Sequence, residues 1–186
     1  MSKPFKAILK GCIKGDSRAQ RELYERLAPK MLAICSRYAR TKAEAEDILQ
    51  EGFVKVFVNI HKYQDRGSLE GWIKRIMINC AIDHLRKEKA YSQQASVNEV
   101  VLGDDSADAL DNLAMEDLIG LIQRLPDGYR MVFNLYAIEG YNHAEIAQQL
   151  NISESTSRSQ YTRARAMLKH KIRELYLEKY TLRDAI

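Results

Sequence analysis

The stretch Asn142–Lys169, which reads N-H-A-E-I-A-Q-Q-L-N-I-S-E-S-T-S-R-S-Q-Y-T-R-A-R-A-M-L-K, decides the fold of this chain. It predicts a helix, a tight turn and a second helix. Asn142 is placed to cap the first helix, and Glu145, three residues later, can complete a capping box. Asn151 and Ile152 supply the turn, and Ser153 is a good N-cap for the second helix.

The second helix of this stretch has two chemically different faces. At about 100° per residue, one face collects residues that can pack: Ser157, Tyr161, Ala164, Leu168 and Ile172. The other collects hydroxyls and guanidinium groups: Ser155, Arg158, Ser159, Thr162 and Arg163. Arg can bridge O6 and N7 of guanine, so this second face suits a DNA major groove. The alternative is an ordinary helical hairpin with a solvated basic face.

Composition limits the other classes of function. The chain has 186 residues, 46% of them hydrophobic, and its net charge of +4 is too small to indicate nucleic-acid binding by itself. The three cysteines are far apart and predict buried thiols rather than a disulfide. The histidines are scattered, so we expect no metal site and no cofactor. No segment predicts a membrane span or a signal peptide, which favours a cytoplasmic protein.

Apolar residues at spacings of three and four predict an all-α chain throughout. Residues 5–14 form the first expected helix, and Asp16 or Ser17 caps a longer one that Pro29 should kink or split. A further helix follows Thr41. Its acidic first half suits the helix macrodipole, or alternatively a patch for a basic partner. Phe53 and Phe57 lie next to that acidic patch and leave room for an apolar anchor.

Residues 61–69 predict a loop, and a basic helix runs from there to about residue 88, with Ser68 as its cap. Tyr63, Trp72 and Tyr91 lie close to its basic side chains. Aromatic and basic groups together suit single-stranded nucleic acid, because bases stack on the rings while the cations neutralise phosphates. For Trp72 the alternative of an ordinary core residue is strong.

The chain divides into two small helical domains, residues 1–91 and 113–186, joined by a flexible acidic linker at 92–112. The second domain begins with an apolar helix that stops at Pro126-Asp127-Gly128. A further helix ends at Gly140, and the helix-turn-helix follows.

Two stretches of the sequence resemble one family. E-A-E-D-I-L-Q-E-G-F-V-K-V-F, followed by R-G-S-L-E-G-W-I-K-R-I-M-I-N-C-A-I-D-H-L-R-K, is similar to the second conserved region of bacterial sigma factors. L-P-D-G-Y-R-M-V-F-N-L-Y-A-I-E-G-Y-N-H-A-E-I-A-Q-Q-L-N-I-S, followed by S-R-S-Q-Y-T-R-A-R, is similar to the fourth region. The short chain and brief linker resemble the extracytoplasmic function (ECF) group.

The resemblance implies three sets of site residues. The polymerase-binding set, which would dock on a coiled coil of the largest subunit, is Asp47, Gln50, Glu51, Phe53 and Val56. The set for capture of the melted −10 strand is Tyr63, Arg66, Trp72, Arg75, Asn79, Asp83 and Arg86. The set for the −35 duplex is Ser155, Thr156, Arg158, Ser159, Thr162, Arg163 and Arg165.

The resemblance also implies partners: core RNA polymerase, including the flap of the second large subunit, promoter DNA, and an anti-sigma factor or another dedicated regulator. It implies no enzymatic activity. The alternative function is a helix-turn-helix regulator that binds duplex DNA only, and an enzyme is a remote third. The sequence departs from the family pattern at Gln160, where a basic residue is usual. Gly52 is unusual inside the docking helix and suggests a close approach to a partner.

Overall fold

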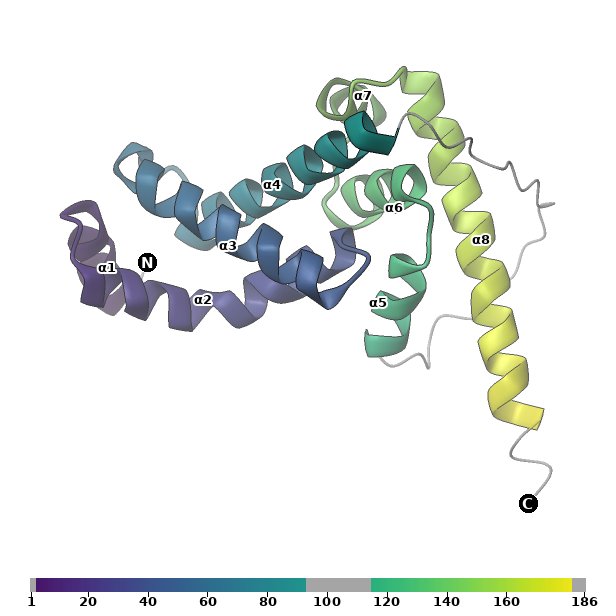
Figure 1. Ribbon diagram of the computed structural model, residues 1–186, viewed down its shortest axis with the longest axis horizontal. Coiled ribbons are helices and arrows are strands. Elements are labelled where there is room, and N and C mark those ends of the chain that lie inside the picture. Colours follow the sequence, from purple (N-terminus) through teal and green to yellow (C-terminus); the bar gives the residue numbers. More distant parts are fainter. Residues whose placement is uncertain (1–2, 93–114, 182–186) are drawn as a thin grey trace. The chain divides into compact units, whose positions relative to one another are not determined.

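The computed structural model describes residues 3–92 and 115–181 (Figure 1). Within these ranges every regular element is a helix, which confirms the all-α prediction. The chain separates into two compact units, Met1–Ala90 and Tyr91–Ile186. The predicted linker lies outside the described residues except for Ser92, which ends a helix. No described helix is both long enough and apolar enough to cross a membrane.

The first unit contains α1 (Lys3–Ile13), α2 (Ser17–Tyr38), α3 (Lys42–Asn59), a short 3-10 helix η1 (Ile60–Lys62) and α4 (Leu69–Ser92). Side-chain caps begin the three long helices, and those of Asp16 and Ser68 were predicted. The Asp16 carboxylate accepts a hydrogen bond from the Arg18 N–H at 2.9 Å, and the Thr41 hydroxyl accepts from the Glu44 N–H at 3.2 Å. The Ser68 hydroxyl accepts from the Gly71 N–H at 3.0 Å. Local sequence therefore sets the start of each long helix in this unit.

Pro29 does not split α2, which runs without a break from Ser17 to Tyr38. Proline lacks an N–H and removes one hydrogen bond from a helix interior. The apolar side chains on either side compensate, because Leu27 and Met31 are both buried. Of the two predicted alternatives, two helices or one bent helix, the structure has the single helix, because tertiary packing overrides the local preference.

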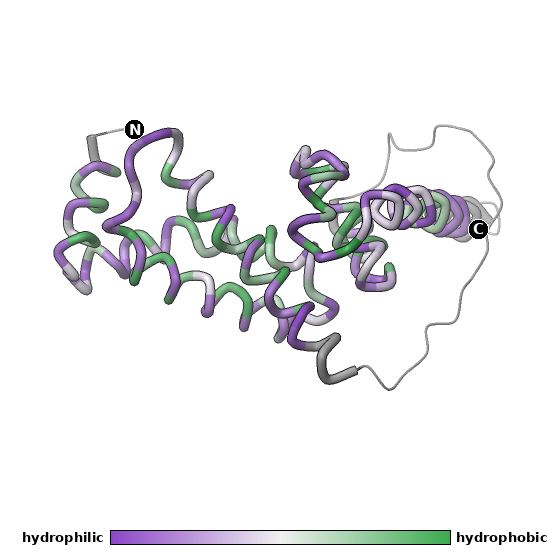
Figure 2. Tube along the Cα trace, turned by 90° about the horizontal axis from the view of Figure 1, so that it is seen from above, coloured by the Kyte–Doolittle hydropathy of each residue, from purple (hydrophilic) through white to green (hydrophobic). Residues whose placement is uncertain are grey.

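Each helix buries one face, and Figure 2 shows hydrophobic and hydrophilic positions alternating along the helices of each unit. The free cysteines Cys12, Cys35 and Cys80 belong to the core of the first unit, as predicted. Burial raises the pKa of all three thiols, that of Cys35 to about 12. They remain protonated at neutral pH and act as small apolar groups.

Gly52 leaves room on α3 for the Met77 side chain of α4. A Cβ atom at this position would lie 2.2 Å from Sδ and 2.9 Å from Cε of Met77 on α4. Met77 is almost completely buried, so its side chain has little room to move. The expectation that Gly52 marks an approach to a partner is therefore corrected: the approach is to a neighbouring helix of the same unit.

The second unit contains α5 (Met115–Gln123), α6 (Asp127–Phe133), a π-helical turn η2 (Asn134–Ile138), α7 (His143–Leu150) and α8 (Glu154–Thr181). The capping box of Asn142 and Glu145 is present, with bonds of 2.9 and 2.8 Å. The core joins α5 to α8 through Leu121, Ile122, Leu125, Ala164, Leu168 and Ile172. The π-helical turn was not predicted.

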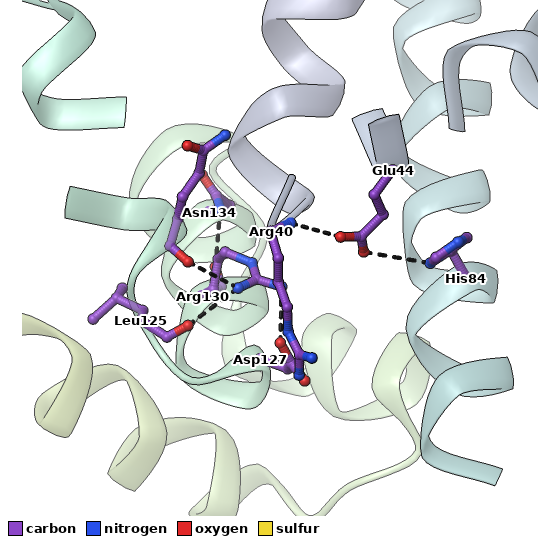
Figure 3. Close-up of polar contacts among 8 residues, drawn as sticks. Arg40, Glu44, His84, Leu125, Asp127, Arg130 and Asn134 are labelled. Atoms are coloured by element: carbon purple, nitrogen blue, oxygen red, sulfur yellow. Dashed lines mark hydrogen bonds and ion pairs between the residues drawn. The ribbon is translucent and has the colours of Figure 1, made fainter. Parts of the chain in front are cut away.

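Arg130 ties the end of α5 to the start of α6 (Figure 3). Its side chain is 2% exposed and donates to the carbonyl oxygens of Gln123 at 3.2 Å and Leu125 at 3.1 Å. It also pairs with the Asp127 carboxylate at 2.8 Å. The guanidinium thereby satisfies carbonyls that a helix end leaves without partners. We refer to this arrangement as the Arg130 clasp.

The Gly52 contact gives a prediction for stability. Gly52→Ala should lower the free energy of unfolding of the first unit by about 1–3 kcal/mol, because the added methyl group overpacks the core against Met77. Chemical denaturation of the full chain measures this. Gly120→Ala is the matched control, since Gly120 lies in a helix with open space around it and alanine should stabilise by up to about 1 kcal/mol.

A double-mutant cycle with Met77→Ala separates the clash from other effects. The two substitutions together should cost less than the sum of their separate costs. Additive costs would show that Gly52 is not required for the approach of α4.

Candidate nucleic-acid interface

The helix-turn-helix of the second unit has the predicted geometry. Asn151 ends α7 in the left-handed conformation, with φ of 53°, and the N–H of Ile152 bonds back to the Ala147 carbonyl at 3.1 Å. Asparagine tolerates this conformation better than most residues. The Ser153 hydroxyl then accepts from the Thr156 N–H at 3.0 Å and so caps α8. The turn orients α8 so that the N-terminal end of this helix is exposed.

A buried polar contact joins the two helices. His143, at the start of α7, lies with Nδ1 2.9 Å from Oγ of Ser157, whose residue is completely buried. The His143 ring stacks on Tyr136 at 4.3 Å between centroids, and Tyr161 closes the cluster at 6.0 Å from His143. Burial lowers the pKa of His143, and the Arg158 charge lowers it further against a smaller opposite effect of Glu154. His143 is therefore neutral at neutral pH.

The opposite face of α8 is exposed to solvent. Of the seven residues predicted to meet −35 DNA, six are exposed, and Thr156 is half-buried. Thr156 and Ser155 each share a hydrogen bond with the capping Ser153 hydroxyl, at 2.8 Å. Each of the three arginines also has a partner within the unit. Arg158 pairs with Glu154, and the Arg165 guanidinium lies 5.9 Å from the Tyr161 ring centre. Arg163 Nη1 lies 3.5 Å from the Tyr129 hydroxyl. Contact of this face with DNA stays a prediction.

Gln160, the position that departs from the family pattern, faces α6 instead. A Cβ at Gly128 would lie 3.1 to 3.3 Å from the amide group of Gln160, which is half-buried. Gly128 therefore leaves room for this side chain. In this chain Gln160 is a packing residue, and the basic face of α8 is complete without it.

On α3 the predicted polymerase-binding residues separate into two groups. Asp47 and Gln50 are exposed, and the Glu51 side chain is 35% exposed. Phe53 and Val56 are buried, and Phe53 packs on the Tyr24 ring at 4.7 Å. A direct surface contact by Phe53 and Val56 is thus incompatible with this structure, and that part of the prediction is corrected.

Two valines lie on the outward face of α3 and were not among the residues predicted to bind polymerase. Val54 is 62% exposed and Val58 is 64% exposed. They lie four residues apart, and therefore on one face of the helix. Their spacing could have been read from the sequence. However, both faces of this helix carry apolar residues, and only packing shows which side is buried.

A cleft of about 390 Å³ lies between the loop before α4 and the first turns of that helix. It is lined by Lys62, Tyr63, Gln64, Arg66, Gly67, Ser68, Gly71, Trp72 and Arg75. The Tyr63 and Trp72 rings stand 5.8 Å apart, and the Tyr63 hydroxyl donates to the Gly67 carbonyl at 2.6 Å. Trp72 is half-buried and lines the cleft, so the structure does not support its alternative as a simple core residue.

The cleft gathers four of the seven residues predicted for −10 DNA: Tyr63, Arg66, Trp72 and Arg75. The other three lie further along α4, outside the cleft lining. Asn79 is exposed and Asp83 is half-buried, with its carboxylate 3.2 Å from Lys55 Nζ and 3.7 Å from Arg86 Nη1. Asp83 is therefore engaged with cations of the protein itself.

Comparison with known proteins identifies the class. Residues 23–91 match Sigma-70 region 2, and residues 115–168 match Sigma-70, region 4. These regions correspond to the two compact units and define a sigma factor.

The chain is similar to two relatives and one solved structure. The ECF RNA polymerase sigma factor SigM of Bacillus subtilis (strain 168) is 30% identical over 153 residues, which are 80% of this chain and 91% of SigM. SigW of the same organism is 30% identical over 187 residues, 94% of this chain and 100% of SigW. The sigma factor RpoE from Bartonella quintana, solved with the anti-sigma factor NepR, aligns over 81% of this chain and 94% of RpoE, with 20% identity and a TM-score of 0.48.

The chain belongs to the ECF RNA polymerase sigma factors. Its function is therefore promoter-specific initiation of transcription with RNA polymerase. The alternative of a regulator that binds duplex DNA only does not account for the first unit, which matches a sigma region.

The buried His143 predicts how the stability of the second unit depends on pH. Its folded pKa lies below the ordinary value of 6.5, so the unfolded chain binds more protons in the interval between the two values. The second unit should therefore keep its full stability above pH 6.5 and lose stability as the pH falls through that interval. Below the folded pKa the loss should level off.

Thermal unfolding between pH 7.5 and 5.5 measures this effect. His143→Phe should flatten the dependence, whereas His170→Gln should retain it, because His170 lies exposed on α8. An equal slope in the wild type and in His143→Phe would contradict the prediction.

Proposed function

We propose that the first unit docks on core RNA polymerase through the outward face of α3, on a coiled coil of the largest subunit. Asp47, Gln50 and Glu51 supply acidic and polar groups, and Val54 and Val58 supply an apolar edge. A second cleft, of about 400 Å³ between α2 and α3, adjoins Gln50 and is lined partly by Tyr24 and Pro29. Such a surface suits a partner helix with basic and apolar side chains.

We further propose that the cleft beside Tyr63 and Trp72 captures an unstacked base of the −10 element. This cleft is the observation that carries the proposal, because it combines two aromatic rings with Lys62, Arg66 and Arg75. Unstacking a base costs a few kcal/mol, and stacking on an aromatic side chain returns about 1–3 kcal/mol per base. The exposed Asn79 and Arg86 extend the contact along α4.

The second unit reads the −35 element as duplex DNA in this proposal. The N-terminal half of α8 enters the major groove, where Arg158, Arg163 and Arg165 offer guanidinium groups and Ser159 and Thr162 offer hydroxyls. Groove contacts by these residues and strand capture in the first unit then act together. Neither step involves bond chemistry by the protein.

The proposal includes further partners. The flap of the second large polymerase subunit would contact the second unit, and an anti-sigma factor or another dedicated regulator would control access to both units. We place this activity in the cytoplasm, where RNA polymerase acts. These assignments rest on membership of the ECF group.

In vitro transcription with core polymerase of the source bacterium, combined with start-site mapping, tests the proposal. The wild type should direct initiation from discrete sites that share two upstream elements. Core polymerase alone should not do so. Initiation that requires another sigma factor would contradict the proposal.

Asp47→Arg should weaken binding to core polymerase at least tenfold, because it places a cation at the centre of the acidic surface. Titration of labelled core with the full chain measures the affinity. The binding of −35 duplex should be unchanged. Glu25→Arg is the matched control, since Glu25 is an exposed acid on α2 and the change in charge is the same. Unchanged core affinity in Asp47→Arg would refute the docking surface.

Arg163→Ala should reduce binding to −35 duplex by roughly 1–3 kcal/mol if Arg163 reads a base. The loss should concentrate on one base pair when all single substitutions of the element are compared. A uniform loss across the variants would make Arg163 a phosphate contact. Tyr129→Phe is the companion variant, because it removes only the hydroxyl 3.5 Å from the guanidinium.

A further inference from the structure

The excess positive charge of this chain lies in residues 1–15. This segment contains four lysines, Lys3, Lys6, Lys10 and Lys14, and no acidic residue. The whole chain has 29 basic and 25 acidic residues, so the part that follows residue 15 carries no net charge. The excess is therefore concentrated on α1 and the turn after it, which belong to none of the binding surfaces described above.

Three of these lysines form one exposed row. Lys6, Lys10 and Lys14 are four residues apart and therefore share a face of the helix. The N–H of Lys14 bonds to the carbonyl oxygens of Lys10 and Gly11, at 3.3 and 3.0 Å, so the helical path continues to this residue. All three lysines are exposed. We call them the α1 lysine row.

Among the described residues no carboxylate forms an ion pair with the α1 lysine row. The exposed arginines of the next helix differ, because Arg21 pairs with Glu25 at 2.8 Å and Arg26 pairs with Glu22 at 2.7 Å. Like charges four residues apart destabilise a helix slightly, and a bound anion would relieve that repulsion. The alternative is an ordinary solvated face, for which removal of the charges would change no binding equilibrium.

The opposite face of α1 is held against α2. Ile8 and Cys12 are buried. A Cβ atom at Gly11 would lie 2.5 Å from the Ala19 Cβ, so Ala19 of α2 lies directly against the backbone of α1. Packing therefore keeps the α1 lysine row on the solvent side of this helix.

The position of α1 relates the row to the cleft beside Tyr63 and Trp72. Besides α2, α1 packs on η1, the short helix that leads into this cleft, and Lys62 at the end of η1 is exposed and lines the cleft. In contrast, α4 begins at the cleft and leads along the chain to the second unit, which would read the upstream −35 element. The upstream part of a captured strand therefore belongs with α4, and the downstream part is left for η1 and α1.

We propose that the α1 lysine row binds phosphates of the single DNA strand directly downstream of the −10 element, an inference that rests on the proposed function. Ammonium groups suit this ligand because they act as point charges on phosphates and carry no base preference. The helix rises about 12 Å from Lys6 to Lys14, long enough to meet more than one phosphate. The row thus extends the grip on the opened strand without adding sequence specificity.

The test measures binding of fluorescent single-stranded oligonucleotides to holoenzyme assembled from core polymerase and the full chain. One oligonucleotide ends at the 3′ edge of the −10 element obtained from start-site mapping. A second continues downstream by about six nucleotides, a usual site size for single-strand binding. The variant combines Lys6→Gln, Lys10→Gln and Lys14→Gln, since glutamine and lysine have similar helix propensities. It should bind the longer oligonucleotide roughly three- to tenfold more weakly than the wild type at ~0.1 M salt, and the shorter one equally well.

Salt dependence identifies the contacts as phosphate contacts. For the longer oligonucleotide, the slope of log affinity against log salt concentration should become shallower by about 2 in the glutamine variant, because each neutralised phosphate of a single strand contributes about 0.7. Arginine at the same three positions keeps the charge and should keep the affinity and the slope. A different base sequence downstream of the −10 element should leave the loss unchanged.

A matched control removes cations elsewhere in the first unit. Arg21→Gln combined with Lys42→Gln eliminates two exposed charges that pair with acids of their own helices, and it should bind both oligonucleotides as the wild type does. Thermal unfolding checks that each variant is folded, and Lys10→Gln alone provides the test if the triple variant is not.

Equal affinity of the wild type and the glutamine variant for the longer oligonucleotide would overturn the proposal. So would an equal loss for the shorter oligonucleotide, an equal loss in the control variant, or a loss that appears with a 5′ extension instead. Weaker binding of the glutamine variant to core polymerase without DNA would show that the row meets an acidic protein surface, and would also overturn it. Failure of the proposed strand capture appears separately, as equal binding of the shorter oligonucleotide and its scrambled version by the wild type.

Discussion

The packing of the Met77 side chain of α4 against Gly52 of α3 is the constraint on which the first unit depends. Met77 occupies the space that a side chain at position 52 would need, so its side chain lies directly against the backbone of α3. This contact fixes the rotation of α3, which sends Phe53 and Val56 inward and leaves Asp47, Gln50, Val54 and Val58 outside. The composition of the outward surface is therefore a consequence of packing on the opposite side of the helix.

The second unit positions α8 by two buried polar devices. The contact of His143 with Ser157 fixes α7 against α8, and the Arg130 clasp fixes α5 against α6. Both place hydrogen-bonding groups in an interior where an unmatched partner would be costly. Apolar contacts alone could be satisfied at several angles, whereas these pairs restrict the helices to one arrangement. The helix that carries the exposed basic face is thus held by buried hydrogen bonds as well as by apolar contacts.

Much of this structure could be predicted from the sequence, because the relevant signals are local. The caps at Asp16, Thr41 and Ser68 and the capping box of Asn142 need only neighbouring residues, and each is present. The two faces of α8 also follow from helical periodicity, since Ser157, Ala164, Leu168 and Ile172 are all buried.

The features that could not be predicted depend on residues distant in sequence. The burial of Phe53 and Val56 is decided by α2 and α4. The Arg130 clasp involves carbonyl oxygens, which carry no sequence signal. The π-helical turn gives the stacking of Tyr136 on His143, and nothing in its composition distinguishes it from α-helix. The cleft beside Trp72 requires the loop conformation, which local patterns do not specify.

The loop at the mouth of that cleft has a kinetic consequence. The Tyr63 hydroxyl donates to the Gly67 carbonyl at 2.6 Å and lies 3.2 Å from the Asp65 carboxylate, so the loop is closed upon itself before any ligand arrives. Ordering a segment during binding costs conformational entropy, and a preorganised rim avoids that cost. In the proposed capture step, the rate of base capture would then be set by the spontaneous opening of the DNA. The protein would bind each base after it has opened.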